Sequence, residues 1–256
     1  MVDGQLGNML TNLYKKLGYI VARKILSQDE VNNLRTCLCH ASGLDDSSYP
    51  TSWLKADISR CPDFYWLIKH RKILAVLREI YQTQPRWAVH SDLHVNLRPG
   101  QSQEYNWHRD NVYRKFGVGP DWSEDYMVTR VGIYLQASNQ NRSPLCIKPG
   151  SHTNEEALKV DTFEPIPGDV VFFDCRAEHS AISPRSSKMA LFLSYGMDNI
   201  HTARHAGYYR HIRKDLKYGD GPPSFKSMLK ENDLLMQTPL VDTLDTQDGV
   251  LIRSGY

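Results

Sequence analysis

The chain has 256 residues, of which 41% are hydrophobic and 23% are charged, and its formal net charge is +2. This composition excludes a disordered chain, a collagen-like fibre and a coiled coil, because it supplies enough apolar side chains for a buried core. The nearly balanced charge gives no reason to expect a nucleic-acid partner, since nucleic-acid-binding proteins usually carry a strong basic excess.

The sequence shows no signal for a membrane or for secretion. No run approaches the roughly 18 to 20 consecutive apolar residues that a membrane span requires, and the first residues lack the basic start and apolar stretch of a secretory signal. The five cysteines are an odd number without a Cys-x-x-Cys pair, which favours a reducing compartment over a disulfide framework. We therefore expect a cytoplasmic protein with no membrane partner.

The N-terminal region, 5–82, is predicted to be mainly helical. Apolar residues recur at helical spacing over 10–17, Gly18 ends that helix, and 19–22 form a short strand. Ser27 and Glu30 have the spacing of a capping box at the start of a second helix. A further apolar periodicity predicts helix over 62–82.

After Pro85 the pattern changes to that of short strands. Residues 87–98 alternate between apolar and polar side chains. Further strands are expected at Val128–Gln136, Pro144–Ile147, Asp169–Phe173 and Met189–Tyr195. Short strands after leading helices favour a double-sheet β-roll with helices packed outside. We expect one domain over 1–256, with its β core at about 86–196 and a basic tail at 197–256.

The segment Trp107-His108-Arg109-Asp110 carries the chemical signal. In an extended strand, residues two apart point to the same side, so the imidazole and the carboxylate can share one metal ion. His179 follows 69 residues after Asp110 as a third ligand. Two histidines and a carboxylate form the facial triad of non-haem Fe(II) oxygenases. The ten histidines of the chain keep an ordinary core or surface role open for each one.

Five motifs in order extend this signal. They are Gly18-Tyr19, the His-x-Asp pair, Pro149-Gly150-Ser151-His152, Pro167-Gly168-Asp169 and the distal His179. In order and spacing, residues 10–196 resemble the phytanoyl-CoA dioxygenase family of Fe(II)/2-oxoglutarate-dependent oxygenases.

The resemblance implies a mainly β fold with flanking α-helices, built on a double-stranded β-helix (jelly-roll, cupin-like) core. It implies that Fe(II), 2-oxoglutarate and O2 are used. It places the iron ligands at His108, Asp110 and His179, and gives His152 a structural role in a turn.

The resemblance also guides the search for the 2-oxoglutarate site. The family usually places an Arg before the strand that follows the distal His, whereas this chain has Lys188 there, with Arg185 as a competitor in the preceding loop. Lys offers a point charge where Arg offers a two-pronged fork. Asn96, on the polar face of its strand, is a further candidate, although that face could simply meet water. Tyr134 and Thr129 are weaker candidates.

Substrate recognition is expected in the loops at the mouth of the barrel. The stretch 111–127, directly after the ligand pair, is the expected lid. Basic and aromatic candidates for a small-molecule substrate, including an anionic one, are Tyr113, Arg114, Arg130 and Arg204. The basic tail 201–217 could close over the same mouth, but we prefer the alternative of a helix over 203–217 with solvated charges.

The expected reaction is hydroxylation of an unactivated C–H bond in a small polar metabolite or natural-product intermediate, with decarboxylation of 2-oxoglutarate to succinate and CO2. In the related halogenases a small residue replaces the carboxylate, so Asp110 disfavours halogenation. Desaturation, cyclisation or demethylation by the same iron chemistry remains open. A metal-binding β-roll without turnover is the alternative of another class, supported by Lys188 and by Ser180-Ala181 after His179.

Overall fold

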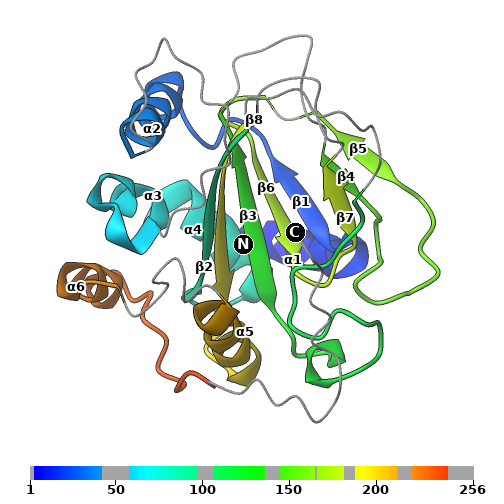
Figure 1. Cartoon of the computed structure of the whole chain (residues 1–256). Coiled ribbons are helices and arrows are strands. Elements are labelled where there is room, and N and C mark those ends of the chain that lie inside the picture. Colours follow the sequence, from blue (N-terminus) through cyan, green and yellow to red (C-terminus); the bar gives the residue numbers. More distant parts are fainter. Residues whose placement is uncertain are drawn as a thin grey trace.

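A computed structural model describes residues 3–41, 58–96, 106–135, 145–164, 166–181, 188–212 and 221–241. Two antiparallel sheets form a β-roll, and helices cover the outer face of the larger sheet (Figure 1). This is the expected mainly β fold, a double-stranded β-helix core with flanking helices.

The larger sheet has five strands and the smaller sheet three. The order in the larger sheet is β1 (Tyr19–Ala22), β6 (Val170–Asp174), β3 (Val128–Tyr134), β8 (Lys188–Gly196), β2 (Arg86–Asn96). The order in the smaller sheet is β5 (Asp161–Phe163), β4 (Leu145–Ile147), β7 (His179–Ala181). The strands predicted from sequence are confirmed to within two residues where they coincide with β1, β3, β4, β6 and β8.

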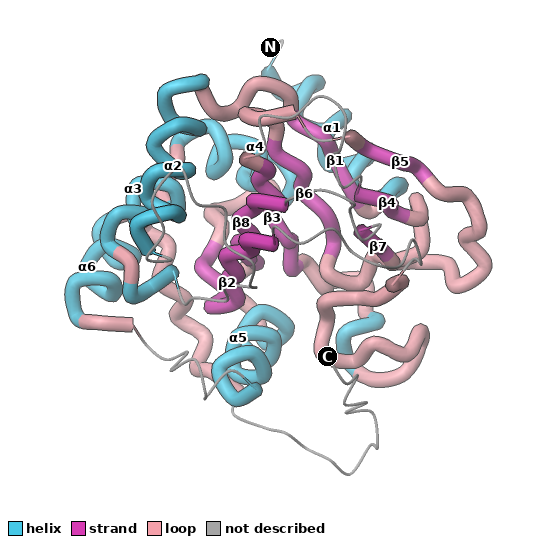
Figure 2. Tube along the Cα trace, turned by 45° about the horizontal axis from the view of Figure 1, so that its top comes forward, coloured by secondary structure: helices cyan, strands magenta, loops and turns pink. Residues whose placement is uncertain are grey.

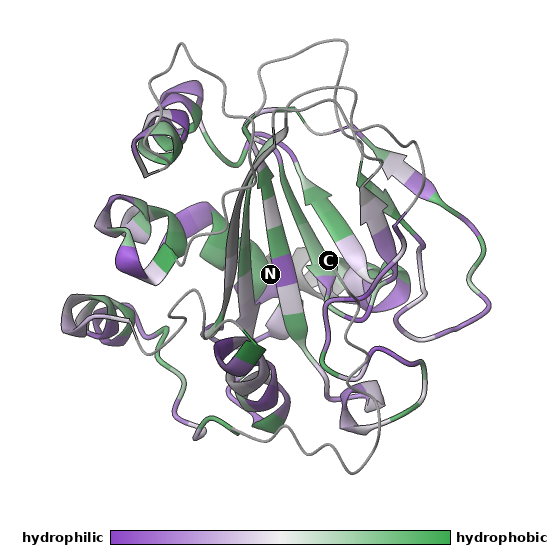
Figure 3. Ribbon diagram, viewed as in Figure 1, coloured by the Kyte–Doolittle hydropathy of each residue, from purple (hydrophilic) through white to green (hydrophobic). Residues whose placement is uncertain are grey.

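Each face of the larger sheet packs against its own layer. On β3, Val131 and Ile133 belong to the outer core, which the sheet shares with the helices. Tyr134 belongs to the inner core between the two sheets. The inner core also includes Leu145, Ile147, Phe163, Val171, Phe173, Ala177, Ala190 and Phe192. Because both faces are buried, the central strands are largely apolar along their length, as Figure 3 shows.

The helical layer begins with two helices that the sequence predicts well. They are α1 (Asp3–Leu17) and α2 (Gln28–Ala41). The capping box before α2 is confirmed, because the Ser27 amide donates to Glu30 Oε2 (2.7 Å) and the Glu30 amide donates to Ser27 Oγ (3.2 Å).

The helical character predicted for 62–82 is confirmed, but the stretch is divided into separate helical pieces. The chain forms the 3-10 turns Ile58–Arg60 and Pro62–Phe64, then α3 (Tyr65–Ile68) and α4 (Arg71–Tyr81). His70 is extended between the last two, and its Nε2 lies 3.2 Å from Glu30 Oε1. This contact with α2 favours the break over local helix propensity, which is a weak determinant.

The C-terminal helices are α5 (Ile200–Ile212) and α6 (Pro223–Glu231). Figure 2 shows α5 near β2 and α6 near α3. The expected solvated helix over 203–217 is wrong for its described part. Eight residues of α5 are buried, among them His201, His205, Tyr208 and Tyr209. Their rings supply apolar surface and their polar atoms can still find partners. No described helix is long and apolar enough to cross a membrane.

Candidate metal centre

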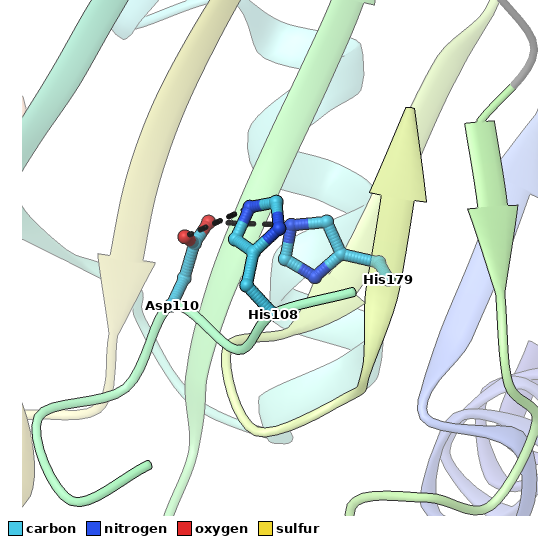
Figure 4. A group of neighbouring side chains, drawn as sticks. All are labelled: His108, Asp110 and His179. Carbon is cyan, nitrogen blue, oxygen red and sulfur yellow. Dashed lines mark ion pairs between the residues drawn. The ribbon is translucent and has the colours of Figure 1, made fainter. Parts of the chain in front are cut away.

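Three side chains converge between the two sheets, as Figure 4 shows. His108 and Asp110 come from the segment after β2, and His179 is the first residue of β7. Asp110 Oδ1 lies 4.0 Å from His108 Nε2, and Asp110 Oδ2 lies 3.8 Å from His179 Nε2. One ligand atom from each residue can be chosen so that all three lie within 4.8 Å of one another. The structure therefore brings the predicted triad together.

Main-chain hydrogen bonds hold the two histidines beside each other. The amide of each donates to the carbonyl of the other, at 3.0 Å in both directions. The amides of Asp110 and Asn111 both donate to the carbonyl of Cys175, at 2.7 and 3.0 Å. The backbone under the triad is thus fixed by strand-like pairing.

Each histidine also has its tautomer fixed. His108 Nδ1 lies 2.8 Å from the carbonyl oxygen of Asn106, and His179 Nδ1 lies 3.0 Å from that of Ala177. A carbonyl can only accept, so each Nδ1 must carry the proton. In the neutral ring the lone pair is then on Nε2, the atom that faces Asp110. This is the arrangement that metal-binding histidines usually show.

Burial keeps His179 ready to bind a cation. Burial and, to a lesser extent, the neighbouring His108 lower the pKa of His179 to about 3, although Asp110 partly opposes the shift. The imidazole is therefore neutral at physiological pH. The His108 side chain is 36% exposed and that of His179 only 7%, so the centre is more accessible from the side of His108.

Arg130 adds a positive charge to this centre. It lies on β3, is 3% exposed, and its Nε lies 3.5 Å from Asp110 Oδ2. Its Nη1 donates to Ser194 Oγ (3.0 Å), and Ser194 is its register partner on β8. The guanidinium also lies over the ring of Phe192, 5.4 Å from its centroid. The structure brings this predicted residue next to the triad.

Two contacts of the centre were not predicted from the sequence. Tyr209 of α5 donates its hydroxyl to the carbonyl oxygen of Asp110 at 2.8 Å. Burial, then the charge of Asp110, raises the pKa of Tyr209, so the hydroxyl keeps the proton that it donates. The second contact is that of Ser194 with Arg130, which could have been predicted only from the pairing of β3 with β8.

The loop that follows Asp110 is held by the buried carboxylate of Asp121. Asp121 Oδ2 accepts the amides of Val112 (2.9 Å) and Tyr113 (3.1 Å). Arg204 of α5 places Nη1 4.0 Å from Asp121 Oδ1. Burial raises the pKa of Asp121, while the hydrogen bonds and Arg204 oppose the rise. Arg204 thus contacts the loop expected to be the lid, and not the triad.

A second buried cation organises the same loop. Arg176 binds Asp174 through Nη2 and Oδ2 (2.8 Å). Its Nη1 donates to the carbonyls of Asp121 (3.2 Å) and Ser123 (2.9 Å). The loop is therefore tied directly to the strand end that leads to His179.

The other predicted co-substrate residues lie at different places. Tyr134 faces the inner core, 5.9 Å from the ring of Phe192. Thr129 faces the helical layer instead, with its hydroxyl 2.7 Å from Tyr14 Oη, so the structure does not bring it to the triad. The backbones of Lys188 and Asn96 are paired across β8 and β2. Arg185 lies outside the described residues.

The predicted substrate residues Tyr113 and Arg114 lie in the loop after Asp110. The Tyr113 carbonyl accepts Trp122 Nε1 at 2.8 Å, and Arg114 is close enough to Tyr209 to oppose the rise in its pKa. His152 has the structural role expected for it. It is buried, and its Nε2 lies 3.0 Å from the carbonyl of Lys15 at the end of α1.

Comparison with known proteins adds the following findings. The family model described as phytanoyl-CoA dioxygenase matches residues 14–190. No curated protein sequence matches the chain.

Three solved structures share the fold. The non-heme alpha ketoglutarate dependent epimerase SnoN from nogalamycin biosynthesis has 18% identity and a TM-score of 0.58, covering 75% of this chain and 83% of its own. The non-heme alpha ketoglutarate dependent carbocyclase SnoK from nogalamycin biosynthesis has 20% identity and a TM-score of 0.57, and the match covers 73% of this chain and 83% of SnoK. EctD from S. alaskensis, solved with 2-oxoglutarate and 5-hydroxyectoine, has 22% identity and a TM-score of 0.56. This match covers 73% of this chain and 75% of EctD.

Proposed function

Because the chain belongs to the phytanoyl-CoA dioxygenase family and is thereby a non-haem Fe(II)/2-oxoglutarate-dependent oxygenase, we propose that it hydroxylates an unactivated C–H bond of a small polar metabolite or natural-product intermediate. One observation carries the proposal. The Nδ1 hydrogen bonds of His108 and His179 fix the tautomer of both rings, so both Nε2 lone pairs lie on the side of the Asp110 carboxylate and are available to a metal ion.

The donor set fits Fe(II). Two neutral imidazoles and one carboxylate are the ligands of the facial triad, and they leave coordination positions open. When bound, Fe(II) with 2-oxoglutarate and O2 supplies the oxidising power for C–H hydroxylation, and succinate and CO2 are released. The chain contributes ligation, orientation and exclusion of water.

Charge balance supports a dianionic co-substrate. A divalent cation, the carboxylate of Asp110 and the guanidinium of Arg130 together leave two positive charges in a largely buried site. Uncompensated charge is costly in such surroundings, and an anionic co-substrate that chelates the metal reduces it. Arg130 is thus suited to an anionic group bound at the metal.

Lys188 remains our proposal for the far carboxylate of 2-oxoglutarate. Its backbone is the first of β8 and lies opposite Asn96 in the register with β2, so the two residues are placed to act at one level of the sheet. Arg130 pairs with Ser194, six residues further along β8 or about 20 Å at the rise of a strand. In this proposal Arg130 acts beside the metal and Lys188 binds the far carboxylate.

The test is an anaerobic titration of metal-free protein with Fe(II) and then 2-oxoglutarate, followed by visible absorption. Chelation to a facial-triad Fe(II) should produce a weak charge-transfer band, and succinate should form when O2 is admitted. His179→Ala should abolish both signals, whereas His211→Ala, in the last turn of α5, should retain them.

The co-substrate assignment is tested in the same titration. Lys188→Ala should weaken 2-oxoglutarate binding at least tenfold, since one charge-assisted hydrogen bond contributes about 1.5–3 kcal/mol. Arg185→Ala is its matched control. Iron binding without a band in the wild-type protein would contradict the proposed function, and the reverse order of the two variants would move the contact to Arg185.

A further inference from the structure

Helix α5 lies beyond the residues matched by the family model, 14–190, yet it contacts the segment that carries Asp110 at three points. Tyr209 donates to the Asp110 carbonyl at 2.8 Å. Arg204 Nη1 lies 4.0 Å from Asp121 Oδ1. His201 Nε2 lies 3.0 Å from Ser123 Oγ and 3.2 Å from Asp125 Oδ1.

The contact of Tyr209 acts on the peptide unit that leads out of Asp110. The carbonyl of Asp110 and the amide of Asn111 belong to one planar unit. Tyr209 holds the oxygen of this unit, and the carbonyl of Cys175 accepts its N–H at 3.0 Å. The unit before Asp110 is held through the Asp110 amide, which donates to the same Cys175 carbonyl.

With both flanking peptides fixed, the direction of the Cα–Cβ bond of Asp110 is fixed as well. Only the two side-chain torsions remain, and Arg130 restrains them from β3. The Tyr209 hydroxyl is the part of this arrangement that comes from outside the β-roll. Tyr209 is 2% exposed, so its hydrogen bond is shielded from competing water.

We propose that Tyr209 is a positioning residue of the metal centre, and that α5 therefore helps to hold Asp110 in its ligand position. Loss of the Tyr209 hydroxyl frees one edge of the peptide unit and lets the carboxylate move relative to the two imidazoles. Contacts to ligand side chains typically change metal affinity by 10- to 100-fold, and we expect this contact to the ligand's main chain to lie at the lower end of that range. The inference rests on the proposed function only in requiring a metal at the triad.

The experiment compares Tyr209→Phe with Tyr195→Phe, using Co(II) as the probe for the metal-free protein. Tyr195 is a matched control, because its buried hydroxyl donates to the carbonyl of Ile68 at 2.7 Å, in the outer core. Tyr209→Phe should raise the Kd for Co(II) about tenfold and change the intensity of the Co(II) visible bands. Tyr195→Phe should lower stability and leave both metal signals unchanged.

Equal Co(II) affinity and spectra in Tyr209→Phe and wild-type protein would overturn the inference. A wild-type protein that binds no Co(II) would instead contradict the proposed function. If Tyr209→Phe does not fold, Arg204→Gln against Arg210→Gln on the same helix provides the second comparison. A lower Co(II) affinity in Arg204→Gln alone supports α5 as part of the site, and equal affinities count against it.

Discussion

Arg130 and Asp110 form a charge pair in which one partner is also a metal ligand candidate. Asp110 has a 15% exposed side chain and Arg130 a 4% exposed one. Removing one member of a buried pair strands the other charge, which typically lowers the free energy of unfolding by 3–5 kcal/mol. In the metal-bound protein a divalent cation supplies a second counter-charge for Asp110.

We therefore expect Arg130→Met to lower the free energy of unfolding of the metal-free protein by about 3 kcal/mol, and saturating Co(II) to reduce this loss. The measurement is urea unfolding of both proteins with and without the metal. Arg86→Met is the control, because Arg86 pairs with Asp198 instead of Asp110, with its Nε 3.3 Å from Asp198 Oδ2. An Arg130→Met loss that is the same with and without Co(II) would show that the pair does not respond to the metal.

Gly18 and His152, which come from two different sequence motifs, pack against each other. Gly18 has φ +77°, and a Cβ at this position would lie 2.5 Å from Nδ1 of His152. His152 in turn contacts the carbonyl of Lys15 at the end of α1. The Gly-Tyr and Pro-Gly-Ser-His motifs are thus two sides of one contact. Sequence reasoning identified each motif, but it had no means to place them together.

At the scale of elements, Asp198 connects three parts of the chain. It lies just before α5, and its carboxylate accepts the amides of Gln237 (3.0 Å) and Thr238 (2.9 Å). Arg86 of β2 places Nε 3.3 Å from Asp198 Oδ2. Burial acts to raise the pKa of Asp198, but the hydrogen bonds from Thr238 and Gln237 and the charge of Arg86 outweigh it, so the pKa is lowered.

A lowered pKa in the folded state means that Asp198 stabilises the fold above its unfolded-state pKa, near 3.9, and that this contribution is lost as the pH falls through the folded-state pKa. We expect Asp198→Ala to lower the free energy of unfolding by about 1.5–3 kcal/mol at neutral pH and by less at about pH 3. Urea unfolding at both pH values measures this difference.

Asp233→Ala is the comparison for Asp198. Asp233 also pairs with Arg86 but its side chain is 67% exposed, so its removal should change stability by less than about 1 kcal/mol. A pH-independent effect of Asp198→Ala, or an effect no larger than that of Asp233→Ala, would contradict the anchoring role.

The elements that could be predicted from sequence are those with a clear pattern of apolar residues. The strands β3 and β8 are long apolar runs between turn residues, and sequence reasoning found them. The strands β5 and β7 have three residues each and are largely polar, Asp-Thr-Phe and His-Ser-Ala, whereas the equally short β4 is an apolar Leu-Cys-Ile run. Helix α5 was misjudged because buried His and Tyr residues look polar in sequence, and only the packing shows which of their atoms are enclosed.

At the scale of the whole molecule, one apolar core joins the helices to the larger sheet. Leu34 of α2, Leu77 of α4 and Leu229 of α6 belong to the same cluster as Val131 and Leu191 of the sheet. None of these side chains is more than 4% exposed. Helices and sheet therefore bury the same surface, and neither can leave without exposing the other.

We expect a single cooperative unfolding transition, as for a one-domain protein. Trp66 and Trp87 report on the helical side, and Trp107 and Trp122 lie near the metal centre. Tryptophan fluorescence and far-ultraviolet circular dichroism should therefore give coincident urea curves. Two separated transitions would show that the helices form a second folding unit, against the single domain expected from sequence.

The candidate site could be predicted in part. The spacing of His108 and Asp110 suggested a ligand pair with His179, and the ordered motifs of the family resemblance selected these three residues among the ten histidines and many carboxylates of the chain. Tyr209 is 99 residues from Asp110 in a stretch whose composition suggested a solvated surface. Its role depends on a hydrogen bond to a main-chain atom, and a main-chain acceptor leaves no mark in the sequence.

The reciprocal main-chain bonds between His108 and His179 have a consequence for which ion the protein receives. The two rings are brought together by strand pairing, so the donors stand in place before any metal arrives. Imidazole and carboxylate ligands bind Cu²⁺, Ni²⁺ and Zn²⁺ more tightly than Fe²⁺ by the general order of divalent affinities. A site assembled in advance does not reverse that order. Loading with iron is then decided by which ions the surroundings supply, and competing metals become inhibitors of the enzyme.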